Sequence, residues 1–187
     1  MKALLGFVFA VLLPGCEKNE PIAQVPSTPT PPQLSNELKG SWPITSSAKV
    51  TGYRFRADSV EEFTNLVHDQ NRIDLGELAK RTEASAELQQ KDVAELLEAT
   101  FQKEEGLSAA ACYYPHHLFV FQNEAGEITH AIEICFGCTN LSTLPSLEEN
   151  QWQRHDFRRL YKLCEALGLA EGSSDEYFKV WDQREAP

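Results

Sequence analysis

The sequence predicts an α+β domain in which a small antiparallel sheet with a central hairpin packs against about three helices. Segments of strand-like alternation are separated by segments with helical spacing, and two apolar strands flank one short turn. Hydrophobic residues make up 42% of the 187 residues, which is enough for the packed core of one ordinary domain with an appendage.

Strand and capping signals predict the first two elements of the domain. Residues 49–56 read as a strand that places Tyr53 and Phe55 on one face. Ser59 is suited to cap a helix that carries a stripe of apolar residues and ends near Asn71.

Two further helices follow from apolar residues at helical spacing. The first opens near Leu88, and its expected buried face consists of Val93, Leu96, Leu97, Thr100 and Phe101. The buried face of the last helix consists of Phe157, Leu160, Tyr161, Cys164 and Leu167. Gly168 is its expected C-terminal cap, and Cys164 is expected to be a buried structural thiol.

A β-hairpin lies between these helices. Residues 117–122 and 127–136 are apolar, and they flank the turn-forming residues 123–126. With four residues in the turn, Gln122 faces Glu127 across the two strands, and this pair sets the register of the hairpin.

The predicted register brings cysteines toward one end of the hairpin. Continuing it places Cys135 opposite Tyr114, and Cys138 then falls opposite Ala111, next to Cys112. The sulfur atoms of Cys112, Cys135 and Cys138 are therefore expected to lie close enough together to form a disulfide or to bind one metal ion.

The alternation of side chains separates the two histidines at the start of the hairpin. His116 shares a face with Cys135, whereas His117 shares the other face with Phe119 and Ile132. The apolar neighbours of His117 identify its face as the core face. The alternation of side chains therefore favours His116 as the partner of the cysteines and predicts that His117 is packed in the core.

The N-terminus resembles the signal of a bacterial lipoprotein. Lys2 precedes an apolar run over residues 3–13, which is too short to span a bilayer but suits a secretory signal. Leu-Pro-Gly-Cys at residues 13–16 then resembles the lipobox of that family. The resemblance implies that residues 1–15 are a removed signal peptide and that Cys16 becomes the acylated N-terminus, with palmitate among its chains. The alternative is an ordinary secretory signal with a chance cysteine.

The same resemblance implies a location and a membrane partner. In lipoproteins of bacteria with two membranes, Asp directly after the acylated cysteine favours retention in the inner membrane, and this chain has Glu17 there. The implied location is the periplasmic face of the outer membrane, in the cell envelope. Several acyl chains, at about 0.8 kcal/mol per buried methylene, anchor a protein stably.

A proline-rich segment separates the signal from the domain. Five of the ten prolines of the chain lie in residues 19–33, which have no hydrophobic periodicity. Such a segment is extended or disordered. We expect residues 16–40 to form a lipid-anchored tether and residues 41–187 to form a single globular domain.

The charge of the chain excludes several partners. A formal net charge of −11 argues against nucleic acid, because phosphate binding needs a basic patch. It also argues against electrostatic docking on anionic lipid, which leaves the acyl chains as the expected membrane contact. The chain has no phosphate-binding loop, no dinucleotide fingerprint and no serine-nucleophile motif.

Cysteines and histidines are concentrated around the hairpin, at Cys112, His116, His117, Cys135 and Cys138. A resemblance to a group of uncharacterised bacterial proteins is carried by the stretch CYYPHHLFVFQNEAGEITHAIEICFGC. Their pattern is Cys-x-x-Pro-(Arg or His)-His, followed by an apolar hairpin that ends in Cys-x-x-Cys. Because that pattern usually has Arg where His116 stands, His117 becomes the alternative ligand. The resemblance implies a fold unit and no reaction.

Three kinds of chemistry fit these residues. Cys112, Cys135 and Cys138 with one histidine would form a tetrahedral zinc site. An oxidising compartment favours a disulfide, and Cys112 with Cys138 is the pair expected from the register. Cys135 and Cys138 form a Cys-x-x-Cys pair that could instead cycle between dithiol and disulfide.

The sequence favours a non-enzymatic binding or structural module whose Cys/His site holds a disulfide or zinc. The alternative is a periplasmic thiol–disulfide redox protein that uses Cys135 and Cys138. Redox pairs of this kind usually lie at the N-terminus of a helix, whereas this pair ends a strand.

Overall fold

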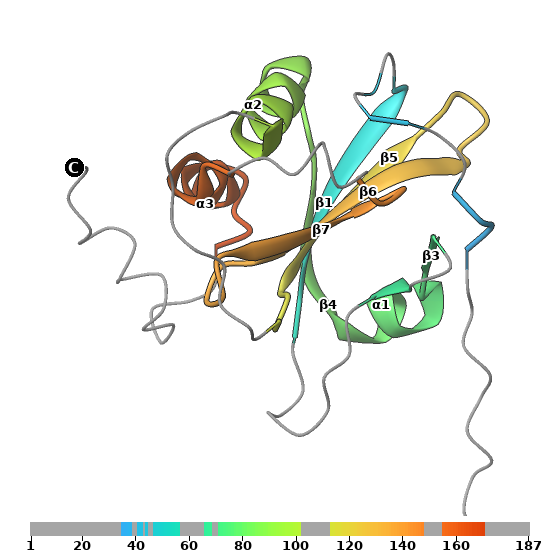
Figure 1. The fold of residues 1–187 in the computed structure, drawn as a ribbon, viewed down its shortest axis with the longest axis horizontal. Coiled ribbons are helices and arrows are strands. Elements are labelled where there is room, and N and C mark those ends of the chain that lie inside the picture. Colours follow the sequence, from blue (N-terminus) through green and yellow to red (C-terminus); the bar gives the residue numbers. More distant parts are fainter. Residues whose placement is uncertain are drawn as a thin grey trace, which may run out of the picture. The chain divides into compact units, whose positions relative to one another are not determined.

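A computed structural model contains a five-stranded antiparallel sheet, and this confirms the predicted α+β class (Figure 1). Its strands run in the order β4 (Thr82–Glu87), β1 (Lys49–Phe55), β5 (His117–Gln122), β6 (Ile128–Cys135) and β7 (Asn140–Leu144). The structure describes residues 35–38, 41–42, 44, 47–56, 66–68, 71–101, 113–147 and 155–170.

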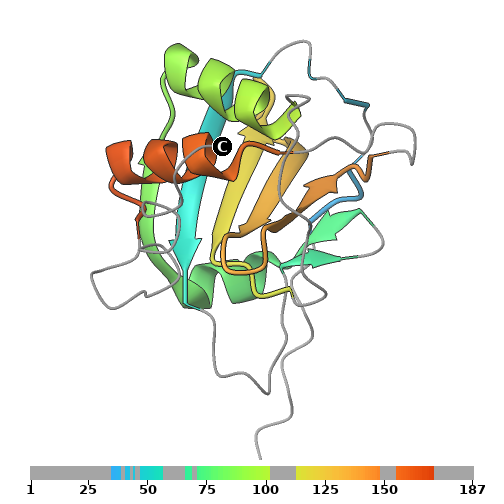
Figure 2. The same cartoon turned by 60° about the vertical axis from the view of Figure 1, so that its left-hand side comes forward.

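Both faces of the sheet are covered. Helices α2 (Gln90–Phe101) and α3 (Phe157–Ala166) lie together over one face (Figure 2). Helix α1 (Leu75–Arg81) packs against the other face, where β2 (Val67–His68) and β3 (Arg72–Ile73) form a two-stranded ribbon. The central strands β5 and β6 are therefore buried on both sides.

Each face of the central hairpin has its own core. Phe119 and Ile132 pack with α2 and α3, which confirms the predicted core face. Leu118 and Val120 pack on the opposite face with Leu78 of α1, so that face is also core. The predicted core face is therefore one of two buried faces, and the burial of the second face was not predicted. Near-continuous apolar runs are typical of strands that are covered on both sides.

The strand predicted for residues 49–56 and the last two predicted helices are confirmed. Tyr53 and Phe55 lie on the same face of β1, and both pack in the core beside α1. Helix α2 turns Leu96 and Thr100 inward.

The two ends of α3 are fixed by capping interactions. The side chain of Asp156 accepts a hydrogen bond from the N–H of Arg159 at 2.9 Å. Gly168 ends the helix with a φ of +69°, which confirms its predicted role. The N–H of Leu169 then donates to the carbonyl of Cys164 at 2.8 Å, which satisfies a carbonyl group at the helix end.

A glycine on β1 makes room for the residue that follows this cap. A Cβ atom added to Gly52 would lie 2.8 Å from Leu169 Cδ1 and 2.8 Å from Phe119 Cε1. Leu169 is fully buried against this part of the sheet. The absence of a side chain at Gly52 therefore lets the C-terminal end of α3 dock on the strand.

The register of the hairpin differs from the prediction by two residues. His117 pairs with Ile134, and a bulge between Phe121 and Gln122 shifts the register near the turn. Hydrogen bonds between the backbone of Asn123 and its neighbours close a tighter turn than the predicted one, and Gly126 adopts a φ of +78°. Because the shift is an even number of residues, the predicted division of side chains between faces is unchanged.

The segment after β6 also departs from the prediction. The strand ends at Cys135, and residues 136–139 turn the chain back so that Asn140 of β7 pairs with Cys135. Thr139 makes this reversal with a φ of +49°. Cys138 therefore lies in a turn, and it does not continue β6 toward Ala111 as the predicted register required.

The helix predicted from Ser59 to Asn71 was wrong in its second half. Val67–His68 is a strand, which pairs with Arg72–Ile73 across a turn at Asn71. The segment that precedes Leu66 lies outside the described residues. Pairing of the chain with itself outweighed the helical pattern of apolar residues here.

The folded domain begins earlier than the predicted boundary at residue 41. The N–H of Ser35 donates to the carbonyl of Ile73 at 2.8 Å, and the N–H of Leu38 donates to that of Asn71 at 2.8 Å. Leu38 is buried in the core beside α1. Residues 35–38 therefore belong to the domain and not to the tether.

Candidate functional site

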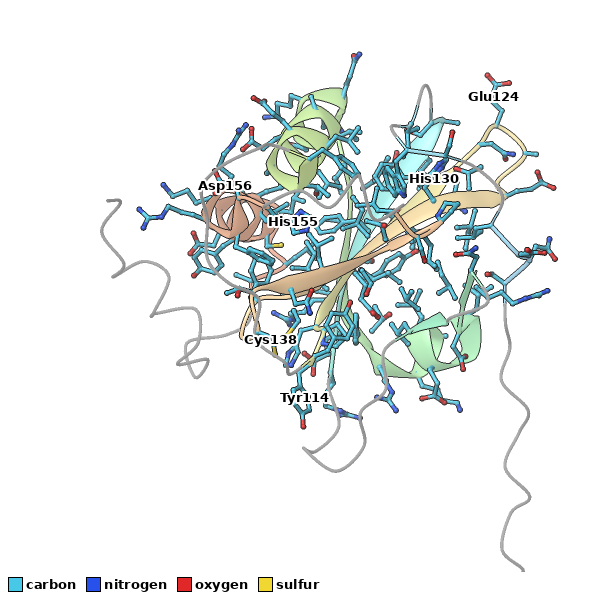
Figure 3. All side chains as sticks on the ribbon, in the orientation of Figure 1. Tyr114, Glu124, His130, Cys138, His155 and Asp156 are labelled. Atoms are coloured by element: carbon cyan, nitrogen blue, oxygen red, sulfur yellow. The ribbon has the colours of Figure 1, made fainter. Side chains whose placement is uncertain are left out.

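The candidate site lies at the end of the sheet where β5 begins and β6 ends. The hairpin turn that carries Glu124 is at the opposite end, and Tyr114 and Cys138 are drawn at the site end (Figure 3). The backbone groups of Tyr114 and Cys138 both hydrogen-bond to the sulfur of Cys135. These contacts define a thiol and disulfide site at the junction of β5, β6 and the following turn.

Cys135 is a free and fully buried thiol at the last position of β6. Its Sγ accepts a hydrogen bond from the N–H of Tyr114 at 3.1 Å, and further hydrogen bonds join it to the backbone of Cys138 and Gly137. Burial raises the pKa of the thiol, and these hydrogen bonds partly oppose the rise. Cys135 is therefore a protonated thiol at neutral pH, in a cradle of backbone groups that favours negative charge.

Cys138 is disulfide-bonded, and the other half of its bridge lies outside the described residues. The Cys138 residue is only 3% exposed, whereas the neighbouring Gly137 is exposed. Cys112, its expected partner, also lies outside the described residues. The pairing of Cys112 with Cys138 therefore stays a prediction.

The described part of the chain does not support the expected zinc site. Its His, Cys, Asp and Glu residues form no group of three or more that could hold a metal ion. His116, Cys135 and Cys138 are among the residues searched, and only Cys112 of the expected ligands is outside them. A sulfur atom in a disulfide also lacks the thiolate that zinc binding requires.

His117 is packed in the core, as parity predicted. It is fully buried, and its Nε2 lies 2.8 Å from the carbonyl of Leu169, to which it donates a hydrogen bond. Burial lowers its pKa to about 4, so the ring is neutral at neutral pH. His117 thus joins β5 to the C-terminal end of α3, which is a structural role rather than the role of a ligand.

His116 is half-buried where the chain enters β5. Its N–H donates to the carbonyl of Ile134 at 3.2 Å, and its carbonyl accepts from the N–H of Phe55 at 2.9 Å. One further step along the observed register places His116 opposite Cys135, so the prediction that they share a face is consistent with the strand pairing. The hydrogen bonds that reach Cys135 Sγ come from backbone groups, which side-chain patterns do not reveal.

Glu133 is the residue that sequence reasoning missed. It is fully buried in the middle of β6 and accepts a hydrogen bond from the N–H of Leu66 at 2.7 Å. The hydroxyl of Tyr113 donates to its other carboxyl oxygen at 3.0 Å, and the backbone of Val67 also hydrogen-bonds to it. Burial raises the pKa of Glu133 to about 7, against these hydrogen bonds.

The sequence signal for Glu133 is a carboxylate inside the apolar run Ile-Glu-Ile-Cys. Buried carboxyl groups are rare and need hydrogen-bond partners, so such a position indicates a tertiary contact. Glu133 and Cys135 lie two positions apart and therefore share a face of β6. Repulsion from Glu133 also contributes to the raised pKa of Cys135.

Cys164 is a buried free thiol on α3, as predicted. It packs within the core cluster beneath α2 and α3, and burial raises the pKa of its thiol. Cys164 and Cys135 are therefore two buried thiols in different settings, one packed among hydrophobic side chains and one bonded to backbone groups of a turn.

The predicted lipid anchor cannot be placed on this structure. The described residues do not include Cys16, the predicted signal peptide over residues 1–15 or most of the predicted tether over residues 16–40. Within the described ranges, no helix has the length and apolar character that crossing a membrane requires. The lipidation of Cys16 stays a prediction.

Comparisons of the chain with protein-family models, with curated proteins and with solved structures gave no match. The resemblances to lipoprotein signals and to the Cys-x-x-Pro-(Arg or His)-His pattern therefore stay predictions.

Proposed function

We propose that this protein is a lipoprotein of the bacterial cell envelope, held by acyl chains on Cys16 at the periplasmic face of the outer membrane. Its α+β domain acts as a binding or structural module rather than as an enzyme. The short apolar N-terminal run and the Leu-Pro-Gly-Cys sequence support the anchor. The proline-rich segment supports a spacer between membrane and domain.

The state of the cysteines is the observation that carries this proposal. Cys138 is disulfide-bonded, whereas Cys135 and Cys164 are free and buried. Bridges form and persist in oxidising compartments such as the periplasm, and they are rare in the cytosol. A bridge at Cys138 ties the turn after β6 to another part of the chain, which is a structural role.

Cell fractionation of a Cys16→Ser variant tests the anchor. We expect the wild-type protein in the membrane fraction and the variant in the soluble periplasmic fraction, because acylation requires the thiol of Cys16. The thermal midpoint of the variant should equal that of the wild type, since the domain is not altered.

A Cys164→Ser variant is the matched control, because it makes the same chemical change at a cysteine that is far from the predicted anchor in the sequence. It should stay in the membrane fraction if it folds. Membrane association of Cys16→Ser would overturn the lipoprotein proposal. If Cys164→Ser also moved to the soluble fraction, the change in fraction would reflect altered folding and not the loss of an anchor.

A periplasmic thiol–disulfide redox protein is the second candidate. The observation that favours it is a free thiol at Cys135 beside a bridged Cys138 in one Cys-x-x-Cys segment. The assay is the reduction of a disulfide-containing protein by a small dithiol, with and without catalytic amounts of the full-length chain. Turnover that is lost in Cys135→Ser and kept in Cys164→Ser would favour the redox protein over the binding module.

A further inference from the structure

We infer that Glu133 forms a pH-sensitive contact: its protonated carboxyl group holds Leu66 and Tyr113 on the sheet, and its ionisation releases them locally while the central strands stay folded. The Glu133 contact consists of Glu133 and its hydrogen-bond partners Leu66, Val67 and Tyr113. The inference does not depend on the lipid anchor or on the state of the cysteines.

Two distant parts of the chain meet at this one carboxyl group. Its Oε1 accepts a hydrogen bond from the N–H of Leu66, 67 residues earlier in the sequence, at 2.7 Å. Its Oε2 accepts from the hydroxyl of Tyr113, 20 residues earlier, at 3.0 Å. The backbone of Val67 bonds to the same carboxyl group. The protonation state of Glu133 therefore affects all of these attachments at once.

The geometry accepts a proton on Glu133 without the loss of a hydrogen bond. The hydroxyl of Tyr113 lies 3.0 Å from Oε2 and 3.3 Å from the backbone carbonyl of Glu133, and it also bonds to the side chain of Ser142. When Oε2 carries the proton, it donates to the tyrosine oxygen, and the hydroxyl turns to donate to the carbonyl. Oε1 keeps its bond from Leu66. The protonated form is therefore paired in the observed arrangement.

The ionised form places a negative charge in a site that excludes water. Glu133 is 0% exposed, and within the described part of the chain no cationic side chain forms an ion pair with it. Burial outweighs the hydrogen bonds and raises the pKa of Glu133 to about 7. Because the carboxyl group ionises near pH 4.5 once water reaches it, opening of the contact becomes easier as the pH rises between these two values.

The charged groups on the neighbouring elements are engaged elsewhere. Arg72 of β3 donates to the carbonyl of Ser35 at 3.0 Å, and Arg81 of α1 forms an ion pair with Glu77 at 2.9 Å. Asp74 accepts a hydrogen bond from the N–H of Glu77 at the start of α1. Further titratable residues on adjacent segments are His68 of β2, His116 before β5 and Cys135 of β6. All of them are kept in the variants below, so any effect of their protonation is kept as well.

The start of β2 can separate from the sheet without disturbing the central strands. Strands β2 and β3 form a two-stranded sheet of their own, whereas β5 and β6 each pair with a neighbour on both sides. Release of Leu66 from Glu133 breaks no backbone hydrogen bond of the five-stranded sheet. The Glu133 contact should therefore open at a lower free energy than the central strands.

Amide hydrogen exchange of the full-length chain in detergent tests the inference. The reporter is the amide of Leu66, because it donates to Glu133 itself, and the references are the amides of β5 and β6. Exchange is read at single residues by mass spectrometry with fragmentation, in steps from about pH 5 to about pH 8. Each rate is compared with that of an unfolded chain at the same pH, which gives a protection factor.

We expect the protection of Leu66 to fall on the order of 50-fold between about pH 5 and about pH 8. In Glu133→Gln, which resembles the protonated acid and cannot ionise, most of this fall should disappear. Glu124→Gln alters an exposed carboxylate and should behave as the wild type. Low urea concentrations should leave the exchange of Leu66 unchanged and accelerate that of the β5 and β6 amides, because a local opening exposes little surface.

The inference is overturned if the protection of Leu66 in the wild type does not fall with pH, or if the fall persists in Glu133→Gln. It is also overturned if Leu66 is protected as strongly as β5 and β6 near pH 8, since the contact would then open only with the whole domain. If Glu133→Gln does not fold, Tyr113→Phe decides. Loss of a donor to the ionised carboxyl group raises the pKa of Glu133, so the fall should extend to a higher pH, and an unchanged pH range overturns the inference.

Discussion

A single carboxyl group connects the central sheet to the small ribbon beside it. Glu133 accepts hydrogen bonds from the backbone of Leu66 and Val67 and from the hydroxyl of Tyr113, all in a site that excludes water. A buried acceptor of this kind fixes where a loop attaches, because leaving its partners unpaired costs about 1–3 kcal/mol for each group. Glu133 of β6 therefore joins the start of β2 to the sheet, in addition to the packing of Val67 and Ile73 in the core beside α1.

The pH dependence of stability should reveal Glu133. Its pKa rises from 4.5 to about 7 on folding, so the folded state binds this proton more tightly than the unfolded state. Taken alone, Glu133 should therefore lower the free energy of unfolding by about 3 kcal/mol as the pH rises from below 4.5 to above 7, whereas the lowered pKa of His117 acts in the opposite direction over part of this range. Glu133→Gln should remove this contribution and keep that of His117, so the difference in the free energy of unfolding between the two proteins, measured by urea unfolding, should change by about 3 kcal/mol across this pH range.

A matched control for this measurement is Glu124→Gln, which alters an exposed carboxylate at the tip of the hairpin turn. Its unfolding curves should follow the wild-type pH dependence. A Glu133→Gln protein that still follows the wild-type curve would show that the carboxyl group of Glu133 does not have a raised pKa in the folded protein.

The hydrogen bond from the ring of His117 to the carbonyl of Leu169 should contribute to the stability of the domain. His117→Phe keeps an aromatic ring in the core but leaves the carbonyl of Leu169 without its donor. We expect a loss of about 1–3 kcal/mol in the free energy of unfolding. His116→Phe, one residue earlier and half-buried, should cost less. If His116→Phe were more destabilising than His117→Phe, His116 and not His117 would have the structural role.

At the scale of elements, the docking of α3 on the sheet depends on shape as well as on hydrogen bonds. The cap at Gly168 turns the chain so that Leu169 enters the space above Gly52. Arg159 of α3 also forms an ion pair with Glu95 of α2 at 2.7 Å, at the partly exposed edge of the helix pair. The close approach at Gly52 lies in the core, so its energetic weight should exceed that of the ion pair.

Gly52→Ala tests the close approach. The added methyl group would need Leu169 and Phe119 to move, and overpacking of this kind costs about 1–3 kcal/mol. Leu169→Ala should cost about 2–5 kcal/mol alone, through the cavity it leaves. In the double variant, the total cost should be less than the sum of the single costs, because the alanine at 169 removes the clash. Additive costs in urea unfolding would contradict the contact.

The elements that the sequence predicted are those with strong local signals. Residues 49–56, the hairpin and the helices α2 and α3 have clear periodicity and caps, and the structure contains all of them. Strand β4 was missed because its sequence, Thr-Glu-Ala-Ser-Ala-Glu, has weak strand propensity and is a strand through its pairing with β1. The helix predicted through Val67 failed for the same reason, since pairing with β3 decides that segment.

The candidate site was predicted in part. The sharing of faces by His117 with Phe119 and Ile132 follows from period-two alternation, and it survived the error in register. The backbone cradle of Cys135 could not be predicted, because it depends on the turn over residues 136–139 rather than on side-chain types. Glu133 was overlooked because its partners are backbone groups distant in the sequence.

At the scale of the whole molecule, the chain combines a proposed membrane anchor, a proline-rich spacer and a domain whose central strands are buried on both faces. The domain reaches back to Ser35, which hydrogen-bonds to Ile73. The composition of the proposed spacer, rich in proline and without hydrophobic periodicity, favours an extended chain. The spacer and the domain should therefore differ sharply in resistance to proteolysis.

Limited proteolysis measures this difference. A protease of broad specificity should cut first within residues 19–33 and leave a core that begins before Ser35. The fragments are identified by mass spectrometry, and the same digestion after reduction serves as the control for the disulfide. Early cuts within residues 117–134, with an intact N-terminal segment, would place the folded part of the chain elsewhere.

The proposed function depends most directly on the state of three sulfur atoms in the domain. Mass spectrometry of the full-length chain, native and then denatured and alkylated without reductant, measures that state. We predict no bound metal, alkylation of Cys135 and Cys164 in the denatured protein as purified, and alkylation of Cys138 only after reduction. A protein that carries zinc in its native mass and releases Cys138 as a free thiol without reductant would contradict the proposed structural bridge.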